Sequence, residues 1–211
     1  MFEAERREVV EFARRAVRDG LVVGTSGNVS RRVGEFVVVT PSGTGYDTMT
    51  AADVPVVDLD GDVVEGGLEP TSELPFHLAA YRDHGAGAVV HTHSPAATAL
   101  SLLRDDVPPV HYQIAMFGGS VAVVPYATFG SDELRDNVSE GLRGRSAVVL
   151  KHHGTVTTGA DLASAYDRAR QLEWLCDVWL RAGAVGVPAE LSAEEIDRVL
   201  PKFATYGRAP R

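Results

Sequence analysis

The sequence has little cysteine, little lysine and no long apolar run. Cys176 is its single cysteine, so no intramolecular disulfide can form, and its place in an apolar helical pattern predicts a small buried hydrophobic side chain. Lys151 and Lys202 are its only lysines, which leaves few candidates for a Schiff-base nucleophile. No apolar segment approaches the length of a transmembrane helix, and the charged N-terminus lacks the apolar core of a secretion signal. We therefore expect a cytoplasmic protein.

Basic charge is also scarce, because the formal net charge is −9. Nucleic acids and anionic membranes bind basic surfaces, so this balance argues against both as partners. With 45% hydrophobic and 23% charged residues, the composition is that of a soluble globular protein with a substantial core. The length predicts one domain spanning residues 1–211.

Hydrophobic periodicity and capping residues predict several helices. Residues 3–18 place apolar side chains at helical spacing, and Gly20 is suited to end this helix. Further helices are predicted from Pro70 to about Asp83 with Thr71 or Ser72 as the cap, from Ser94-Pro95, from Ser131, from Asp161 to about residue 181, and from Ser192.

Short apolar runs predict strands at residues 36–40, 54–59, 62–64, 88–93, 109–114, 120–125 and 146–151. Several of these strands follow one another without an intervening helix. The sequence therefore predicts an α/β domain with a mixed or antiparallel sheet covered by helices.

Histidines end two of the predicted strands. His91 and His93 are two residues apart, so they project from the same face of the strand at 88–93. The run 146–153 also ends in histidines, His152 and His153, of which alternation allows only one to face a shared ion. Two such strand ends favour a zinc-type metal site over ordinary buried histidines.

Polar loops near these strands are suited to holding a phosphate through neutral donors. Residues 24–30 and 41–45 are rich in glycine and hydroxyl groups, and Pro70 precedes a helix N-terminus. On composition alone, residues 24–30 fit an ordinary polar turn better than an anion-binding loop. Glu73 near a metal is a candidate general base, although acidic residues are common in first helical turns. The inventory fits proton abstraction beside the carbonyl of a phosphorylated sugar.

Five motifs resemble the class II aldolase/adducin family in their order along the chain. They are Gly24-Thr-Ser-Gly-Asn-Val-Ser30, Thr40-Pro-Ser-Gly43, Pro70-Thr-Ser-Glu73, Val89-Val-His-Thr-His93 and Lys151-His-His-Gly-Thr155. Within the family, residues 109–114, 125–130 and 202–207 are most similar to the members that cleave L-fuculose 1-phosphate. The resemblance extends from about residue 5 to Gly207.

The resemblance implies a single-domain α/β fold with a central, mostly antiparallel sheet flanked by helices on both faces. It also implies a homotetramer with active sites between subunits and one zinc ion per subunit. The implied zinc ligands are Glu73, His91, His93 and His153, and the implied catalytic residues are Glu73 as acid/base and Tyr112 as a proton donor from a neighbouring subunit. The implied phosphate-binding residues are Gly27, Asn28, Ser42, Gly43, Thr71 and Ser72. Phe129, Phe203 and Tyr206 are implied to shape the aldehyde side of the pocket.

The implied reaction is reversible cleavage of L-fuculose 1-phosphate to glycerone phosphate and L-lactaldehyde. An L-ribulose-5-phosphate 4-epimerase is the main alternative, although such members carry Asp where this chain has Glu73. A methylthioribulose-phosphate dehydratase, a zinc hydrolase and a non-enzymatic adducin-like protein are further alternatives. Thr71 and the bulky pair Met116-Phe117 depart from the expected residues, which leaves the exact sugar open.

Overall fold

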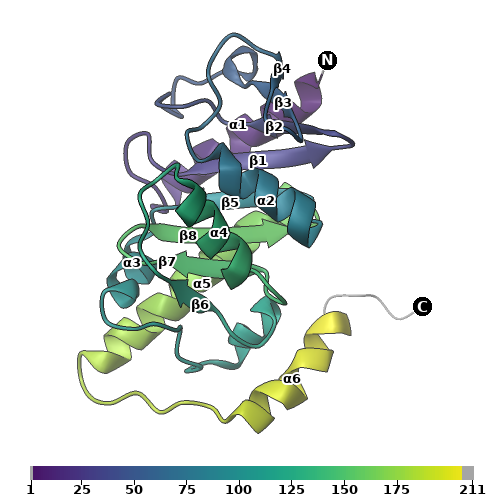
Figure 1. Ribbon diagram of the computed structural model, residues 1–211. Coiled ribbons are helices and arrows are strands. Elements are labelled where there is room, and N and C mark those ends of the chain that lie inside the picture. The colour runs from purple at the N-terminus through teal and green to yellow at the C-terminus, as the bar shows by residue number, and fades with distance from the viewer. Residues whose placement is uncertain (1, 206–211) are drawn as a thin grey trace.

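An eight-stranded sheet extends through the structure, a computed structural model that describes residues 2–205 (Figure 1). The strands are β1 (Asn28–Val33), β2 (Phe36–Val39), β3 (Val56–Asp58), β4 (Val63–Glu65), β5 (Ala88–Thr92), β6 (Ala122–Val124), β7 (Ala147–Leu150) and β8 (Gly154–Gly159). They lie in the order β4-β3-β2-β1-β5-β8-β7-β6. Only β6 and β7 pair in parallel, which confirms the predicted mostly antiparallel sheet.

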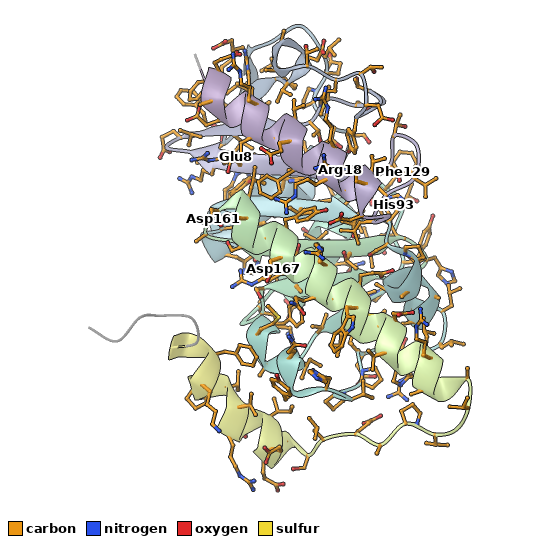
Figure 2. All side chains as sticks on the ribbon, turned by 180° about the vertical axis from the view of Figure 1, so that it is seen from behind. Glu8, Arg18, His93, Phe129, Asp161 and Asp167 are labelled. Carbon is orange, nitrogen blue, oxygen red and sulfur yellow. The ribbon has the colours of Figure 1, made fainter. Side chains whose placement is uncertain are left out.

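Helices cover both faces of the sheet. They are α1 (Glu3–Arg18), α2 (Leu74–His84), α3 (Pro95–Ser101), α4 (Asp132–Gly141), α5 (Leu162–Gly183) and α6 (Ala193–Thr205), with short 3₁₀ helices η1 (Ala51–Asp53) and η2 (Tyr112–Phe117). Helices α2 and α4 lie on one face (Figure 1), and α1 and α5 cross the other (Figure 2). Helix α6 packs beside η2 beyond the β6 edge. No helix in the described residues is long and apolar enough to cross a membrane.

Successive valines in the sheet pack alternately against the helices on its two faces. Val37 and Val39 pack with α2 and α4, whereas Val38 between them packs with α1. In β5, Val89 faces the α2 side and Val90 the α5 side, and both are fully buried. Burial of such side chains contributes roughly 1.5–3 kcal/mol each, so β5 is held firmly from both faces. The strand that carries the first histidines is therefore a rigid support.

Three of the predicted helix starts use the expected capping residues, among them Ser192, whose hydroxyl accepts from Glu195 N at 3.2 Å before α6. Asp161 accepts a hydrogen bond from Ser164 N at 2.7 Å and begins α5, and Ser131 likewise accepts from Leu134 N at 3.1 Å to begin α4. At α3, by contrast, the carboxylate of Glu173 accepts from the amides of Ala96 and Ala97 instead of the Ser94 hydroxyl. Buried Cys176 lies on the inner face of α5, as predicted, and burial raises the pKa of its thiol.

The predicted strand at 109–114 is wrong. Pro108 and Pro109 lack backbone donors, and Val110 N closes a tight turn onto Pro108 O at 2.8 Å. The chain then enters η2, where His111 Nδ1 accepts from Gln113 N at 3.3 Å. Strands β1 and β8 were not predicted, since their sequences begin or end among glycines, asparagine and arginines.

Candidate metal centre and substrate pocket

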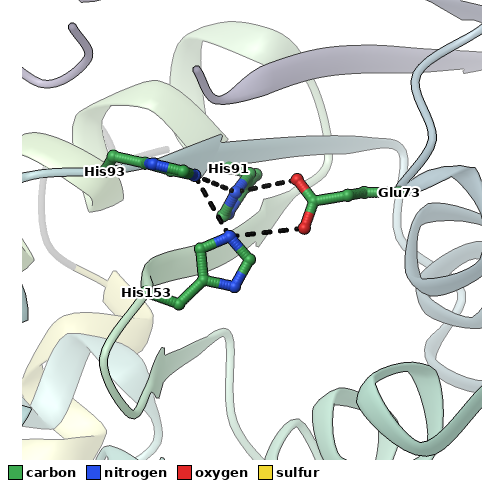
Figure 3. A group of neighbouring side chains, drawn as sticks. All are labelled: Glu73, His91, His93 and His153. Atoms are coloured by element: carbon green, nitrogen blue, oxygen red, sulfur yellow. Dashed lines mark hydrogen bonds and ion pairs between the residues drawn. The ribbon is translucent and has the colours of Figure 1, made fainter. Parts of the chain in front are cut away.

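Four side chains from separate segments converge at one end of β5. His91 and His93 come from β5 and the residue after it, Glu73 from the start of α2, and His153 from the loop before β8 (Figure 3). One ligand atom from each lies within 4.8 Å of all the others. His93 Nε2 is 3.0 Å from His91 Nε2 and 3.1 Å from His153 Nε2. Glu73 Oε2 lies 3.1 Å from His91 Nε2, and its Oε1 lies 3.3 Å from His153 Nε2.

These separations fit a tetrahedral metal centre. Metal–nitrogen distances of about 2.0–2.1 Å place the ligand atoms of a tetrahedron about 3.3–3.4 Å apart. His91 Nδ1 lies 2.9 Å from Thr155 O; because a carbonyl only accepts, Nδ1 carries the proton and Nε2 offers its lone pair to the centre. Buried Glu73 Oε1 has no hydrogen-bond partner in the described part of the chain. A buried carboxylate oxygen that receives no hydrogen bond and lies beside three imidazole nitrogens is suited to bind a divalent cation.

The protonation states at the centre also suit a cation. Burial lowers the pKa of His93 to about 3, with a further contribution from His91. The same two causes lower the pKa of His153 to about 4. Burial alone would raise the pKa of Glu73, but the adjacent His91, His153 and Asn28 hold it well below its usual range. At neutral pH, Glu73 is ionised and His93 and His153 are neutral, as metal binding requires.

Close backbone packing brings His153 to the β5 histidines. A Cβ at Gly154 would lie 2.0 Å from Thr92 O, so only glycine lets β8 begin this close to β5. The predicted strand alternation of His152 and His153 is wrong, because both lie in the turn between β7 and β8. His152 instead has a left-handed backbone with φ 58°, and its amide donates to buried Ser101 Oγ at 3.1 Å. This turn separates the two imidazoles, and His153 alone joins the cluster.

The cluster of Glu73 and the three histidines, the candidate metal centre, opens into a pocket with a volume of about 290 Å³. All six residues expected to bind phosphate line this pocket: Gly27, Asn28, Ser42, Gly43, Thr71 and Ser72. No lysine or arginine of residues 2–205 lines it, so its donors are neutral. Gly27 is required here because its φ is 74° and a Cβ would lie 2.8 Å from His91 O. The loops that carry the residues expected to bind phosphate therefore adjoin the candidate metal centre.

The start of α2 differs from the prediction. Glu73, which was expected in the first turn, is the N-cap residue, and neither Thr71 nor Ser72 occupies that position. Thr71 Oγ1 accepts from Glu73 N at 3.3 Å and from Asn28 Nδ2 at 3.0 Å. The second Asn28 Nδ2 proton is donated to Glu73 Oε2 at 2.9 Å. The buried Asn28 side chain thus joins Glu73 to Thr71 instead of pointing freely into the pocket.

The residues expected on the aldehyde side separate into two places. Phe129 lines the metal-centre pocket and lies at the same edge as His93 (Figure 2). Tyr112 and Phe203 lie together in a second pocket that shares no lining residue with the first, with ring centroids 6.3 Å apart. Tyr206 falls outside the described residues. Within one chain, Tyr112 and Phe203 are therefore not brought to Glu73.

Two aromatic residues at the pocket were given no role there from the sequence. Tyr126 and His152 line it together with Phe129, and their rings meet edge to face at 6.1 Å. The motif Pro125–Gly130 was the available indication for Tyr126. A Cβ at Gly130 would lie 2.9 Å from Ser72 O, so the loop of residues 125–130 packs closely against the loop that carries Thr71 and Ser72.

The chain belongs to the class II aldolase and adducin family, because the family model described as Class II Aldolase and Adducin N-terminal domain matches residues 7–180. An L-fuculose phosphate aldolase of Escherichia coli strain K12 is 41% identical over 204 residues, which cover 95% of this chain and 94% of that one. A 5-deoxy-D-ribulose 1-phosphate aldolase of Bacillus thuringiensis serovar kurstaki is 36% identical over 211 residues, with 99% of each chain covered.

A solved structure agrees with these relatives. A structure titled L-fuculose 1-phosphate aldolase superposes with a TM-score of 0.92 at 33% identity, covering 95% of this chain and 96% of the other. The predicted family and fold are thereby confirmed.

Proposed function

We propose that this protein is a zinc-dependent aldolase that reversibly cleaves L-fuculose 1-phosphate to glycerone phosphate and L-lactaldehyde. The carrying observation is the convergence of Glu73, His91, His93 and His153 beside a pocket lined by neutral donors. Three imidazoles and a carboxylate at tetrahedral spacing suit zinc. Support for this sugar comes from the relatives named L-fuculose phosphate aldolase.

The substrate phosphate would lie against the loops that carry Gly27, Ser42, Gly43 and Ser72. Their amides and hydroxyls bind an anion without a fixed positive charge. Asn28 would act indirectly here, because its side chain donates to the Thr71 hydroxyl and orients it. With the phosphate held at this end, the ketose carbonyl would lie toward the metal centre.

Glu73 and the three histidines would hold a divalent ion before substrate binds, and Glu73 would leave the ion when the ketose binds. The bound ion supplies polarisation of the ketose carbonyl and stabilisation of negative charge on its oxygen. In condensation, Glu73 would take the proton beside the carbonyl of glycerone phosphate; in cleavage, it would return it. Its low pKa favours the ionised form needed to accept that proton. Neither lysine lines the pocket, and Lys151 Nζ is paired with Asp105 at 2.5 Å, so a Schiff base has no support here.

Tyr112 would protonate the aldehyde oxygen during bond formation, from a neighbouring subunit of a homotetramer. Its side chain is half exposed and lies outside the metal-centre pocket of its own chain, which is compatible with action on another subunit. Mixed assemblies of Glu73→Gln and Tyr112→Phe subunits should recover activity that neither variant shows alone. Failure of all mixtures to recover activity would contradict action between subunits.

A second candidate substrate is 5-deoxy-D-ribulose 1-phosphate, which is named for the Bacillus relative. Both sugars are 1-phosphorylated ketoses with a terminal methyl group. Tyr126 and Phe129 at the pocket would pack against such a methyl in either case. The chemistry and the phosphate site would be the same, and only the aldehyde released would differ.

Product analysis with a panel of ketose phosphates tests these proposals. The metal-loaded protein should release glycerone phosphate from L-fuculose 1-phosphate, with a higher kcat/KM than for 5-deoxy-D-ribulose 1-phosphate. The reverse order would transfer the proposal to the second sugar. L-Ribulose 5-phosphate should be a poor substrate; its epimerisation without triose phosphate release would overturn the proposed aldolase reaction.

A further inference from the structure

A row of buried polar side chains leads from Glu73 away from the pocket, between α2 and the sheet. Asn28, His77, Ser30 and Tyr81 form it, and each is at most 4% exposed. His77 Nε2 lies 2.5 Å from Asn28 Oδ1, and His77 Nδ1 lies 2.7 Å from Ser30 Oγ. Ser30 Oγ lies 2.5 Å from the Tyr81 hydroxyl. None of these side chains except Asn28 lines the pocket.

The carboxylate of Glu73 sets the direction of every hydrogen bond in this row. An ionised carboxylate only accepts, so Asn28 must present Nδ2 to Glu73 Oε2, and its Oδ1 must face His77. His77 Nε2 must then carry a proton, since Oδ1 only accepts. Full burial, with a further contribution from His91, lowers the pKa of His77 to about 3, so the ring is neutral. Its Nδ1 therefore accepts from the Ser30 hydroxyl.

We propose that His77 is a positioning residue for the general base, and that its Nε2–H locks the Asn28 amide in the orientation that donates to Glu73. This inference rests on the proposed role of Glu73. The reversed amide would place Oδ1 2.9 Å from Glu73 Oε2, with two acceptors opposed, and Nδ2 against the His77 N–H. On the side of Asn28 that faces away from the pocket, the His77 N–H is the group that excludes the reversed amide.

The Asn28 hydrogen bond also decides which carboxylate oxygen stays free. Oε2 receives the Asn28 donor, whereas Oε1 has no hydrogen bond within residues 2–205. His77 therefore acts through Asn28 on Oε2, which also lies 3.1 Å from His91 Nε2, and this leaves Oε1 directed toward His153. Phe76 stacks on the His77 ring with centroids 4.8 Å apart, which fixes the ring plane for this task.

Two substitutions separate positioning from simple packing. The amide nitrogen of Gln can occupy the position of a histidine Nε2, so His77→Gln keeps a donor for Asn28 but loses the bond with Ser30. His77→Leu loses both. We expect His77→Leu in the metal-loaded protein to lower kcat about 10- to 100-fold, as for the loss of one hydrogen bond to a charged group, with KM nearly unchanged. His77→Gln should retain most of the wild-type kcat, although its melting temperature should be similar to that of His77→Leu. Equal losses of kcat in both variants would overturn the proposal.

A measurement on the wild-type protein needs neither turnover nor a stable variant. Nitrogen-15 NMR of the labelled histidines, with His77 assigned by its absence from His77→Gln, reports which ring nitrogen is protonated. The Nε2–H form is expected between pH 6 and 8; a Nδ1–H or charged ring would overturn the proposal. If the wild type releases glycerone phosphate from no ketose phosphate, the proposed function fails, while the NMR result still decides the His77 assignment.

Discussion

Replacement of Glu73 by Gln tests the centre most directly. The amide keeps an oxygen that can accept from Asn28 Nδ2, now 2.9 Å from Glu73 Oε2, but it supplies neither a base nor a negative ligand. General acid–base catalysis contributes about 10²–10⁴-fold, or about 2.7–5.4 kcal/mol of barrier. We therefore expect Glu73→Gln to lower kcat at least about 100-fold. Converting a hydrogen bond with a charged acceptor to a neutral one removes about 1 kcal/mol of stability, about 2–4 °C in melting temperature.

The assay couples glycerone phosphate release to a dehydrogenase and is read beside bound metal and the melting temperature. Glu69→Gln is the matched control, because this exposed glutamate lies close in sequence and outside the pocket lining. It should leave kcat and metal content unchanged. A Glu73→Gln protein that binds metal and keeps near wild-type kcat would refute the assignment of the base.

Three further predictions concern the metal and its support. Removal of divalent metal with a chelator should abolish activity, whereas borohydride with substrate should not; the opposite pattern would indicate a Schiff base. Gly154→Ala, whose Cβ would lie 2.0 Å from Thr92 O, should lose about 1–3 kcal/mol and most bound metal, whereas Gly183→Ala, with open space around it, should lose neither. In metal-free protein the pKa values of His93 and His153 are about 3 and about 4, below the ordinary value of about 6.5. The unfolded state therefore binds more protons than the folded state, so the free energy of unfolding measured with urea should fall as pH decreases from about 6.5 to about 4. The fall should be less steep for His93→Gln, and an equal slope in that variant would contradict this explanation.

The β5 histidines could be predicted from local pattern alone. Val89 and Val90 are buried on opposite faces, as expected for a β-branched run in a strand that is covered on both sides. Side chains along a strand alternate between its two faces, so a spacing of two residues is enough to bring His91 and His93 together. Their Nε2 atoms lie 3.0 Å apart, which confirms that the two side chains project from the same face.

Strands β1 and β8 could not be predicted because tertiary pairing overrides their local preference. Asn28–Val33 contains two arginines and no apolar alternation, yet it is paired on both sides, by β2 and β5. Gly154–Gly159 buries Thr157, whose hydroxyl donates to Ala165 O at 2.9 Å. Such partners are remote in sequence, so composition indicated turns where the sheet contains strands.

Asn28 shows the same limit at the site. The family resemblance of its motif implied a phosphate-binding residue, and Asn28 does line the pocket. Its amide, however, is committed to Glu73, Thr71 and His77, which lie 43–49 positions away. Hydrogen bonds over that separation have no periodicity for a sequence pattern to detect, so the row behind the base became visible only in three dimensions.

His153 lies in the cluster with Glu73, His91 and His93, as expected, but the local geometry that places it there differs from the prediction. Strand alternation would make its position depend on the register of β7, whereas it depends on the turn at His152 and on the contact of Gly154 with Thr92. A non-glycine residue with φ 58° is sparsely populated and persists only where its surroundings hold it, as Ser101 does through the His152 amide. The third imidazole is therefore sensitive to backbone changes at residues 152–154, while conservative apolar exchanges within β7 should leave it in place.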